Sequence, residues 1–409
     1  MQQQYPQTSP YGQQPQPQPS YGHPPMGHGP GPGAGPGPGT EQLCVHCGQP
    51  PFGPRRPKRS RAKLWIGGAV VAALLAGGGG YAYWGTDWFD GNGEAVTFAK
   101  PKTPAQGAGA ASGGGAAANG PDPDVSLPTG PASQFKQSTK LDDGTRISKT
   151  RLKGAKSGFE GDVWVWTPKE YDEAKYANSA FPVMIALPGG NGYPDNYWAT
   201  MPNIGLQKAI AESSAKGTGL PFILVMPLLN PDSKNYYDGS DIPGQPKMGT
   251  WIAEDVPDLA KANFRTYKSR DGWAIMGNSS GAFVGLKQVM QHPEKFRGVI
   301  ANGGETAPDS PLWKNNKAEM DANDPAKLAQ KLIQSKGPEV YVNFQYGTKE
   351  GGRDRLEKFQ RENGKGPIKI DLYEIQGGDH NGWDYVRGMK EQGLAALSKV
   401  MKGPKPSAG

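Results

Sequence analysis

The sequence predicts an α/β fold in which a mostly parallel sheet carries helices on both faces. Two observations predict it. Short apolar runs alternate with amphipathic stretches of helical length from Val163 to Val400, an order typical of strands joined by crossover helices. One glycine-flanked serine, Ser279, also stands between such an apolar run and such a helical stretch, which is the strand, sharp turn and helix context of a nucleophile elbow.

The individual elements follow in chain order. The predicted strands are Val163–Trp166, Val183–Leu187, Phe222–Met226, Trp273–Met276, Val299–Ala301, Val340–Gln345 and Ile368–Tyr373. The predicted helices are Ile204–Ser214, Ile252–Asn263, Ala282–Gln291, Pro325–Ser335, Asp354–Glu362 and Trp383–Val400. This order of elements, together with the serine turn, is that of an α/β-hydrolase.

Composition divides the chain around this domain. The 409 residues include 60 Gly and 40 Pro and are only 35% hydrophobic, but the bias is local. Residues 1–63 form a Pro-, Gln- and Gly-rich tail that we expect to be disordered, because it has too few aliphatic side chains to offset chain entropy. Residues 85–133 are predicted to be a flexible linker, since Pro101–Ser133 is rich in Gly, Ala and Pro. Residues 134–403 are long enough for one domain with a full core, and 404–409 form a short tail.

A transmembrane helix is predicted at Leu64–Trp84, a segment of 21 residues without a charged side chain. At about 1.5 Å per residue this length matches a bilayer core of about 30 Å. Basic residues gather before it, in 55–63, and Asp87, Asp90 and Glu94 follow it. The positive-inside rule therefore places the N-terminus in the cytoplasm and the C-terminal domain outside the membrane. Because much of the formal net charge of +7 is this topology signal, we expect no nucleic-acid partner.

Both cysteines, Cys44 and Cys47, lie in the predicted cytoplasmic tail. A C-x-x-C-G motif is half of a zinc knuckle, and a closed structural zinc site needs four ligands. His46, His28 or a second chain are the candidates for the remaining ligands, and the alternative is a cytosolic dithiol without metal. The outer domain has no cysteine, so it depends on its core rather than on disulfides.

The candidate nucleophile is Ser279, in the only G-x-S-x-G motif of the chain, G-N-S-S-G. The glycines two positions before and after the serine keep a strained turn uncrowded. The alternative is a chance match in a glycine-rich chain. In this fold an acid and then a histidine follow the serine. His380 follows the last predicted strand, where the base belongs, whereas His292 ends the helix after the serine and is expected to have a helix-terminus role.

Two carboxylates follow the predicted strand Val340–Gln345, and either could orient the imidazole and stabilise the imidazolium. Glu350 is closer to the end of the strand and is preferred, whereas Asp354 falls where the next helix begins and suits an N-cap. The oxyanion hole is predicted from two backbone amides, those of Ser280 and of Gly190 in the L-P-G-G turn. The alternative for this turn is an ordinary strand end.

These residues give the domain a resemblance to a known family, carried by the segments LPGGNGYPDNYW, VMPLL, IMGNSSGAF, GTKEG and GGDHNGW. The domain resembles the esterases of the α/β-hydrolase fold that include esterase D and the cell-wall mycolyltransferase antigens. The resemblance implies that Ser279 is the nucleophile, Glu350 the acid and His380 the base. It also implies that Gly190 and Ser280 supply the oxyanion amides.

The same resemblance suggests substrate contacts. Asp195 and Trp198 fall near the place where the transferases hold a sugar acceptor, and Trp383 ends the histidine motif. Two departures, Ser280 where the transferases usually have Met and Pro188 where relatives carry His or Asp, leave substrate specificity open.

The function expected from the sequence is that of a membrane-anchored, extracytoplasmic serine esterase or acyltransferase that needs no catalytic cofactor. An acyl ester or a glycolipid of the cell envelope is the expected partner. The alternative is a non-catalytic binding module tethered to the membrane on the same fold.

Overall fold

The computed structural model describes residues 94–96, 98 and 122–407. Cys44, Cys47 and the apolar segment Leu64–Trp84 lie outside the described residues, so the zinc site and the membrane span stay predictions. Among the helices that are described, none is long and apolar enough to cross a bilayer.

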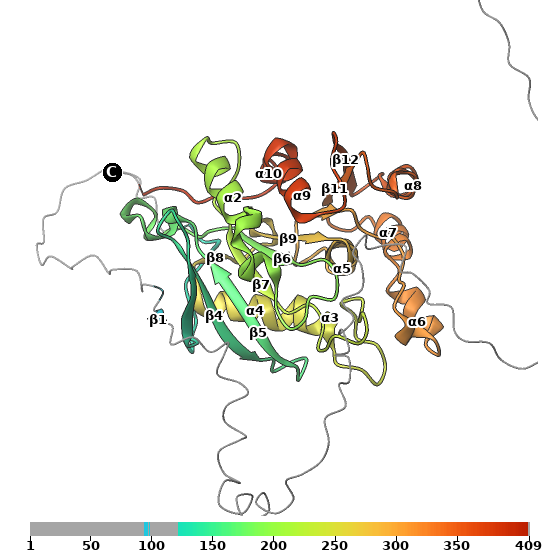
Figure 1. Ribbon diagram of the computed structural model, residues 1–409, viewed down its shortest axis with the longest axis horizontal. Coiled ribbons are helices and arrows are strands. Elements are labelled where there is room, and N and C mark those ends of the chain that lie inside the picture. Colours follow the sequence, from blue (N-terminus) through green and yellow to red (C-terminus); the bar gives the residue numbers. More distant parts are fainter. Residues whose placement is uncertain (1–93, 97, 99–121, 408–409) are drawn as a thin grey trace, which may run out of the picture. The chain divides into compact units, whose positions relative to one another are not determined.

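A large central sheet organises the described chain (Figure 1). Its ten strands have the order β1-β3-β4-β5-β7-β6-β9-β10-β11-β12. They are β1 (Ala95–Val96), β3 (Phe135–Lys140), β4 (Arg146–Lys153), β5 (Glu160–Trp166), β6 (Val183–Leu187), β7 (Ile223–Pro227), β9 (Trp273–Asn278), β10 (Gly298–Asn302), β11 (Val340–Gly347) and β12 (Ile368–Ile375). The six strands from β7 to β12 in this order run parallel, and β1, β3, β4 and β5 form an antiparallel meander on one side of them.

Strand side chains alternate between two separate hydrophobic cores, one on each face of the sheet. In β6, Val183, Ile185 and Leu187 pack in one core, and Met184 and Ala186 pack in the other. This period of two is what a strand buried on both faces requires. It explains why the inner parallel strands, such as β6 and β7, have continuous apolar sequences.

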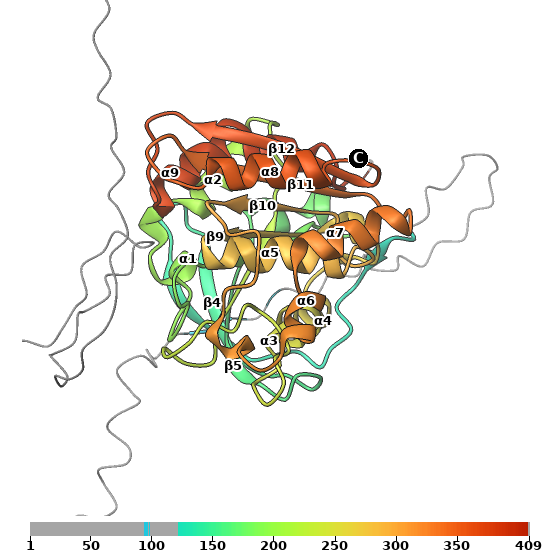
Figure 2. The same ribbon diagram turned by 90° about the vertical axis from the view of Figure 1, so that its right-hand side faces the viewer.

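Helices cover both faces of the sheet. One core receives side chains from α4 (Val256–Asn263), α5 (Ser280–Gln291), α7 (Pro325–Gln334) and α8 (Arg353–Asn363). The other core receives them from α1 (Tyr197–Thr200), α2 (Leu206–Ala215), α9 (Gly382–Gly388) and α10 (Leu394–Ser398). In Figure 2, α5 and α7 lie side by side below the parallel strands, in agreement with their contacts.

Two of these helical stretches contain a π-helical turn. Trp251–Asp255 joins α3 (Met248–Thr250) to α4, and Met389–Gly393 joins α9 to α10. Gly388 and Gly393 bring the second turn close to the sheet, since an added Cβ on either would lie within 3 Å of the Gln345 amide. The remaining α6 (Lys317–Ala322) precedes α7.

The sequence prediction of an α/β fold with a mostly parallel sheet is confirmed, but it missed the antiparallel meander. Strands β3 and β4 are only partly buried and are rich in Lys, Arg, Ser and Thr. They therefore lack the apolar runs by which the central strands were predicted.

The predicted limits of the domain also differ from the structure, at both ends. Ala95–Val96 pairs with β3, and β2 (Val125–Ser126) pairs with β8 (Thr266–Tyr267), although both lie in the predicted linker. At the other end, Lys405 bonds to Asp122, and its carbonyl accepts from the Ser179 hydroxyl. Residues 404–407 are therefore part of the fold rather than a free tail.

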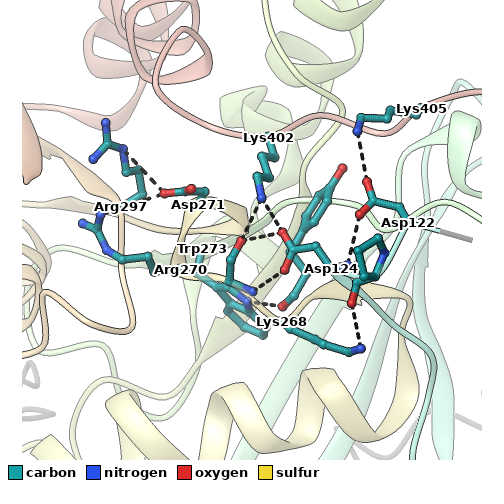
Figure 3. Close-up of polar contacts among 12 residues, drawn as sticks. Asp122, Asp124, Lys268, Arg270, Asp271, Trp273, Arg297, Lys402 and Lys405 are labelled. Carbon is teal, nitrogen blue, oxygen red and sulfur yellow. Dashed lines mark hydrogen bonds and ion pairs between the residues drawn. The ribbon is translucent and has the colours of Figure 1, made fainter. Parts of the chain in front are cut away.

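Asp122, Asp124, Lys402 and Lys405 form a clasp between the beginning and the end of the domain (Figure 3). Lys402 Nζ lies 2.6 Å from Asp124 Oδ2, and Lys405 Nζ lies 3.0 Å from Asp122 Oδ2. Asp124 also accepts from the backbone N–H and the hydroxyl of Ser269, four residues before β9 begins. The clasp therefore lies at the amino ends of the parallel strands.

Candidate active site

Ser279 lies at the opposite, carboxyl end of β9, between the last residue of that strand and the first residue of α5. Its φ of 51° and ψ of −117° fall in a region that a residue with a side chain rarely adopts. A Cβ on Gly277 would lie 2.2 Å from the Gly281 carbonyl oxygen, and a Cβ on Gly281 would lie 2.4 Å from the Pro188 oxygen. Both motif glycines are therefore required sterically, and the strained strand-to-helix turn predicted from the sequence is present.

Glu350 and His380 form a short hydrogen-bonded pair. His380 Nδ1 lies 2.6 Å from Glu350 Oε2, and the Glu350 side chain is only 3% exposed. The second carboxylate oxygen, Oε1, accepts from the Gly347 N–H at 2.5 Å. The His380 imidazole is 34% exposed, so the acid of the pair is buried while the imidazole ring is accessible.

Backbone hydrogen bonds hold the loops of this pair together. The Lys349 N–H donates to the Gly378 carbonyl at 2.9 Å, and the Gly377 N–H donates to the Thr348 hydroxyl at 2.8 Å. Gly347 has no room for a side chain, because a Cβ would lie 2.4 Å from the Gly378 backbone. Asn381 then caps α9 by accepting from the Asp384 N–H, which fixes the residue next to His380.

The sheet brings the three predicted triad residues to one edge, because Ser279, Glu350 and His380 follow the carboxyl ends of the parallel strands β9, β11 and β12. The Ser279 N–H donates to the Asn302 carbonyl at the end of β10. Gly303, the next residue, lies against Glu350, because its Cβ position is 2.9 Å from Oε2. On the other side, a Cβ on Gly382 would lie 4.0 Å from the Asn278 amide nitrogen.

The loop after β6 borders Ser279 on its other side. A Cβ on Gly189 would lie 3.3 Å from Ser279 Cβ, and the Ser280 hydroxyl donates to the Gly190 carbonyl at 2.6 Å. Among the described residues the amides of Gly190 and Ser280 have no hydrogen-bond acceptor. Both predicted oxyanion donors are therefore available next to the serine.

Tyr197 and Tyr385 are two site residues that the sequence analysis missed. The Tyr197 hydroxyl accepts from the Gly189 N–H at 2.8 Å, and burial raises the pKa of Tyr197 to about 12. The Tyr385 hydroxyl donates to Glu350 Oε2 at 2.5 Å. Burial, followed by the charge of Glu350, raises the pKa of Tyr385 well above its usual range. A tyrosine in a short helix resembles a core residue, so no sequence signal pointed to either.

Two predictions about single side chains need correction. Trp198 is only 1% exposed, and its indole N–H donates to the Leu187 carbonyl, so it belongs to the core and does not contact a substrate. Asp354 is not an N-cap, because α8 begins at Arg353 after Gly352, which adopts a φ of 95°. Asp354 therefore lies in the first turn of the helix.

The structure also places the other predicted residues. His292 is the C-cap of α5, as a helix-terminus role requires. Asp195 is half-buried in the loop before α1. Trp383, in the first turn of α9, is 53% exposed. No group of three His, Cys, Asp or Glu side chains suited to a metal ion occurs in the described part of the chain.

Residues 158–381 match the model of a protein family described as "Putative esterase". An uncharacterized protein of Corynebacterium glutamicum is 27% identical over 158 residues, which are 37% of this chain and 34% of that protein. An esterase of Mycobacterium tuberculosis is 26% identical over 161 residues, which are 39% of this chain and 32% of that protein. The matched region thus spans about a third of the length of these relatives.

Two solved structures share the fold. A ferulic acid esterase aligns with a TM-score of 0.51 at 17% identity and covers 63% of this chain and 98% of its own. An S-formylglutathione hydrolase of Agrobacterium tumefaciens aligns with a TM-score of 0.51 at 18% identity and covers 65% and 99% of the two chains. The described residues therefore have the α/β-hydrolase fold expected from the sequence.

Proposed function

The chain belongs to the "Putative esterase" family, and from that premise we propose that its folded domain is a serine esterase that works through an acyl-enzyme. The single observation that carries the proposal is the convergence at one sheet edge of the strained Ser279 turn and the Glu350–His380 pair, whose atoms lie 2.6 Å apart. A strained nucleophile turn and a carboxylate-bound imidazole are the parts that acyl transfer requires.

The reaction follows from the positions of these groups. His380 takes the proton of the Ser279 hydroxyl as its oxygen attacks the ester carbonyl, and the Gly190 and Ser280 amides donate to the oxyanion. Collapse of this intermediate breaks the bond to the leaving alcohol, which receives the proton from His380. Water then attacks the acyl-enzyme by the reverse proton transfers and releases the acid and free Ser279. Glu350 stays ionised and stabilises the imidazolium throughout.

The exposed apolar side chains support an apolar acyl or aromatic group in the substrate. Tyr193, Met201, Tyr236 and Trp383 are between 37% and 53% exposed. All four lie in segments that follow the carboxyl ends of β6, β7 or β12. The loops that carry Tyr193 and Tyr236 are joined by a hydrogen bond from the Asn191 amide to the Asn235 carbonyl. Exposed apolar side chains at this edge of the sheet are therefore the candidates for contact with such a group.

We also propose that the domain acts outside the cell membrane, held by Leu64–Trp84. The charge-free span and the basic residues in 55–63 support this placement. An envelope lipid or glycolipid with an apolar acyl chain is then within reach. Transfer of the acyl group to an envelope sugar hydroxyl in place of water is the second outcome that the same acyl-enzyme allows.

A fluorophosphonate probe tests the function directly on the full-length protein. We expect labelling of Ser279 alone, complete loss of labelling in Ser279→Ala, and hydrolysis of p-nitrophenyl esters that depends on the same residue. Ser335→Ala, which alters a serine at the end of α7, is the matched control and should label like the unchanged protein. Labelling at another serine, or none in the folded protein, would refute the proposal.

A further inference from the structure

Polar atoms of Tyr385, Glu350 and His380 form a triangle next to the catalytic acid, and the proposed mechanism does not use Tyr385. Tyr385 Oη lies 2.5 Å from Glu350 Oε2 and 2.7 Å from His380 Nδ1, and those two atoms lie 2.6 Å from each other. Tyr385 is only 1% exposed, so its hydroxyl faces the triad and not the substrate. These three short contacts determine where the hydrogen atoms must lie.

Gly303 makes room for the triangle. Its φ is 56°, and an added Cβ would lie 1.9 Å from Tyr385 Oη and 2.9 Å from Glu350 Oε2. Any larger residue would displace the phenol from the carboxylate. The chain therefore brings the tyrosine to the acid through a specific gap next to β10.

The hydrogens follow from chemistry. Glu350 is a carboxylate that already accepts from the Gly347 N–H, so the phenol is the donor between Oη and Oε2. With its only hydrogen committed to Glu350, Tyr385 presents lone pairs to His380 Nδ1. Both neighbours of Nδ1 are then acceptors, and the imidazole must carry its hydrogen on Nδ1 and leave Nε2 free to act as the base.

We infer that Tyr385 is a positioning residue, which holds the Glu350 carboxylate and fixes the His380 tautomer that accepts the serine proton. It acts through its contacts with Glu350 Oε2 and His380 Nδ1 and does not touch the reacting atoms. The inference rests on the proposed esterase function, whose own failure would appear separately as absence of labelling in the unchanged protein.

A double-mutant cycle on the full-length protein tests the inference. Tyr385→Phe should slow fluorophosphonate inactivation and lower kcat by about tenfold, the scale of one lost hydrogen bond to a charged group. KM should not change, because the ring is buried away from the substrate. In a Glu350→Gln background the same substitution should cost less than about twofold, since the carboxylate that fixes the direction of the phenol hydrogen, and with it the lone pairs that face His380 Nδ1, is gone. Rates are compared well below the melting midpoint of each variant.

Tyr341→Phe is the matched control. Tyr341 is 6% exposed, and its hydroxyl donates to the Asp371 carboxylate at 2.7 Å, at the opposite end of β11. Its removal should alter stability without altering the inactivation rate. Equal losses from Tyr385→Phe in both acid backgrounds, or no loss with Glu350 present, would overturn the inference.

A proton NMR measurement provides a readout that does not depend on turnover. The Nδ1 hydrogen of a histidine bonded to a carboxylate gives a strongly downfield resonance. Removal of the competing phenol donor leaves Glu350 Oε2 more basic, so this resonance should move further downfield in Tyr385→Phe. An unchanged chemical shift would show that the phenol does not act on the pair.

Discussion

At the scale of single residues, the two carboxylates of one loop differ in their surroundings. Glu350 is 3% exposed and bonds His380 at 2.6 Å, whereas Asp354 is exposed in the first turn of α8. We expect Glu350→Gln to lower kcat by roughly 10³- to 10⁴-fold, because the imidazolium loses its counter-charge and its tautomer is no longer fixed. Ester hydrolysis by the purified variant measures this.

The matched variant is Asp354→Asn. It removes only a negative charge near a helix N-terminus, which contributes about 0.3–1 kcal/mol to stability. Activity should stay within about twofold of the unchanged protein, with a small fall in the melting midpoint. If Glu350→Gln kept full activity and Asp354→Asn lost it, the acid would have to be reassigned.

Trp383 gives a second prediction, on substrate choice. Its exposed indole lies three residues after His380, so Trp383→Ala should lower kcat/KM for long-chain p-nitrophenyl esters by about tenfold and for the acetate ester by less than about twofold. Leu127→Ala is the control, because Leu127 is also 53% exposed but lies next to β2. A loss that is the same for every chain length would contradict an acyl-binding role.

The residues of the site differ in how far the sequence could predict them. Ser279, Glu350 and His380 could be proposed because the fold imposes a chain order on a nucleophile, an acid and a base. Tyr385 could not, because its bond to Glu350 depends on the gap at Gly303 in a distant strand end. Trp198 was assigned wrongly for a related reason: sequence alone does not tell a buried indole from one at a binding surface.

At the scale of elements, one side chain joins the two halves of the predicted oxyanion hole. The Ser280 hydroxyl at the start of α5 donates to the Gly190 carbonyl of the loop after β6 at 2.6 Å. We expect Ser280→Ala to lower kcat about three- to tenfold, because one hydrogen bond of about 0.5–1.5 kcal/mol no longer orients the Gly190 amide. KM and the melting midpoint should change little.

The control for this prediction is Ser280→Thr, which keeps a hydroxyl at the same position and should retain most of the activity. Steady-state kinetics on both variants make the comparison. Equal activity in the alanine variant and the unchanged protein would mean that the loop is held by other contacts, such as the bond from the Gly189 N–H to Tyr197.

The sequence predicted elements well where burial is complete and poorly where it is partial. The parallel strands β6, β7, β9 and β11 are buried on both faces and appeared as apolar runs, with ends that agree to within a few residues. Strands β3 and β4 are only partly buried and carry many charged side chains. Their strand conformation therefore depends on hydrogen bonds to neighbouring strands rather than on an apolar run that the sequence would show. The helix predicted at Trp383–Val400 is observed as α9 and α10, but its π-helical turn Met389–Gly393 has no signature in the local residue pattern.

At the scale of the whole molecule, the clasp gives a pH-dependent prediction. Burial acts to raise the pKa of Asp124, but hydrogen bonds from Lys402 and Ser269 outweigh it and lower the value. A carboxyl with a lowered pKa in the folded state contributes stability above its unfolded pKa of about 3.9, and this contribution is lost as pH falls through the folded value. As the pH falls below about 3.9 toward the lower pKa of folded Asp124, the segment 122–126 should therefore become accessible to an acid-active protease.

Asp124→Asn should produce the same accessibility at neutral pH, because the amide cannot form the ion pair with Lys402. The control is Asp258→Asn on α4, which removes an exposed ion pair between Asp258 and Lys156 and should leave the segment 122–126 protected. Mapping of the cleavage sites by mass spectrometry distinguishes the two. Continued protection of residues 122–126 in Asp124→Asn would show that the pairing of β2 with β8 is sufficient by itself.

The chain meets the domain at two places before it reaches the parallel strands. The first is β1, the edge strand of the meander, which pairs with β3, and the second is the clasp, at the amino ends of the parallel strands. Ser279 lies at their carboxyl ends, a separation of about 20 Å along the six residues of β9. If Leu64–Trp84 spans the membrane as proposed, the part of the domain that the linker reaches first is therefore β1, at the edge of the sheet.

Protease accessibility in intact cells tests this arrangement. In protoplasts that express the full chain, added protease should cut within residues 101–121, the part of the predicted linker that precedes the clasp, because Asp122 and Asp124 are held by lysines of the C-terminal segment. The active domain is then held at the membrane only by the pairing of β1 with β3. The Cys44 and Cys47 thiols, predicted on the cytoplasmic side, should stay unreactive to a membrane-impermeant maleimide until the membrane is permeabilised. Nine residues, 85–93, separate the predicted span from Glu94, the residue before β1, and a flexible stretch of this length gives a reach of roughly 15–18 Å, so acyl esters at or near the outer membrane surface are the accessible substrates. Maleimide labelling of intact cells, or a domain that protease reaches only after lysis, would reverse the topology and place the esterase among cytoplasmic substrates.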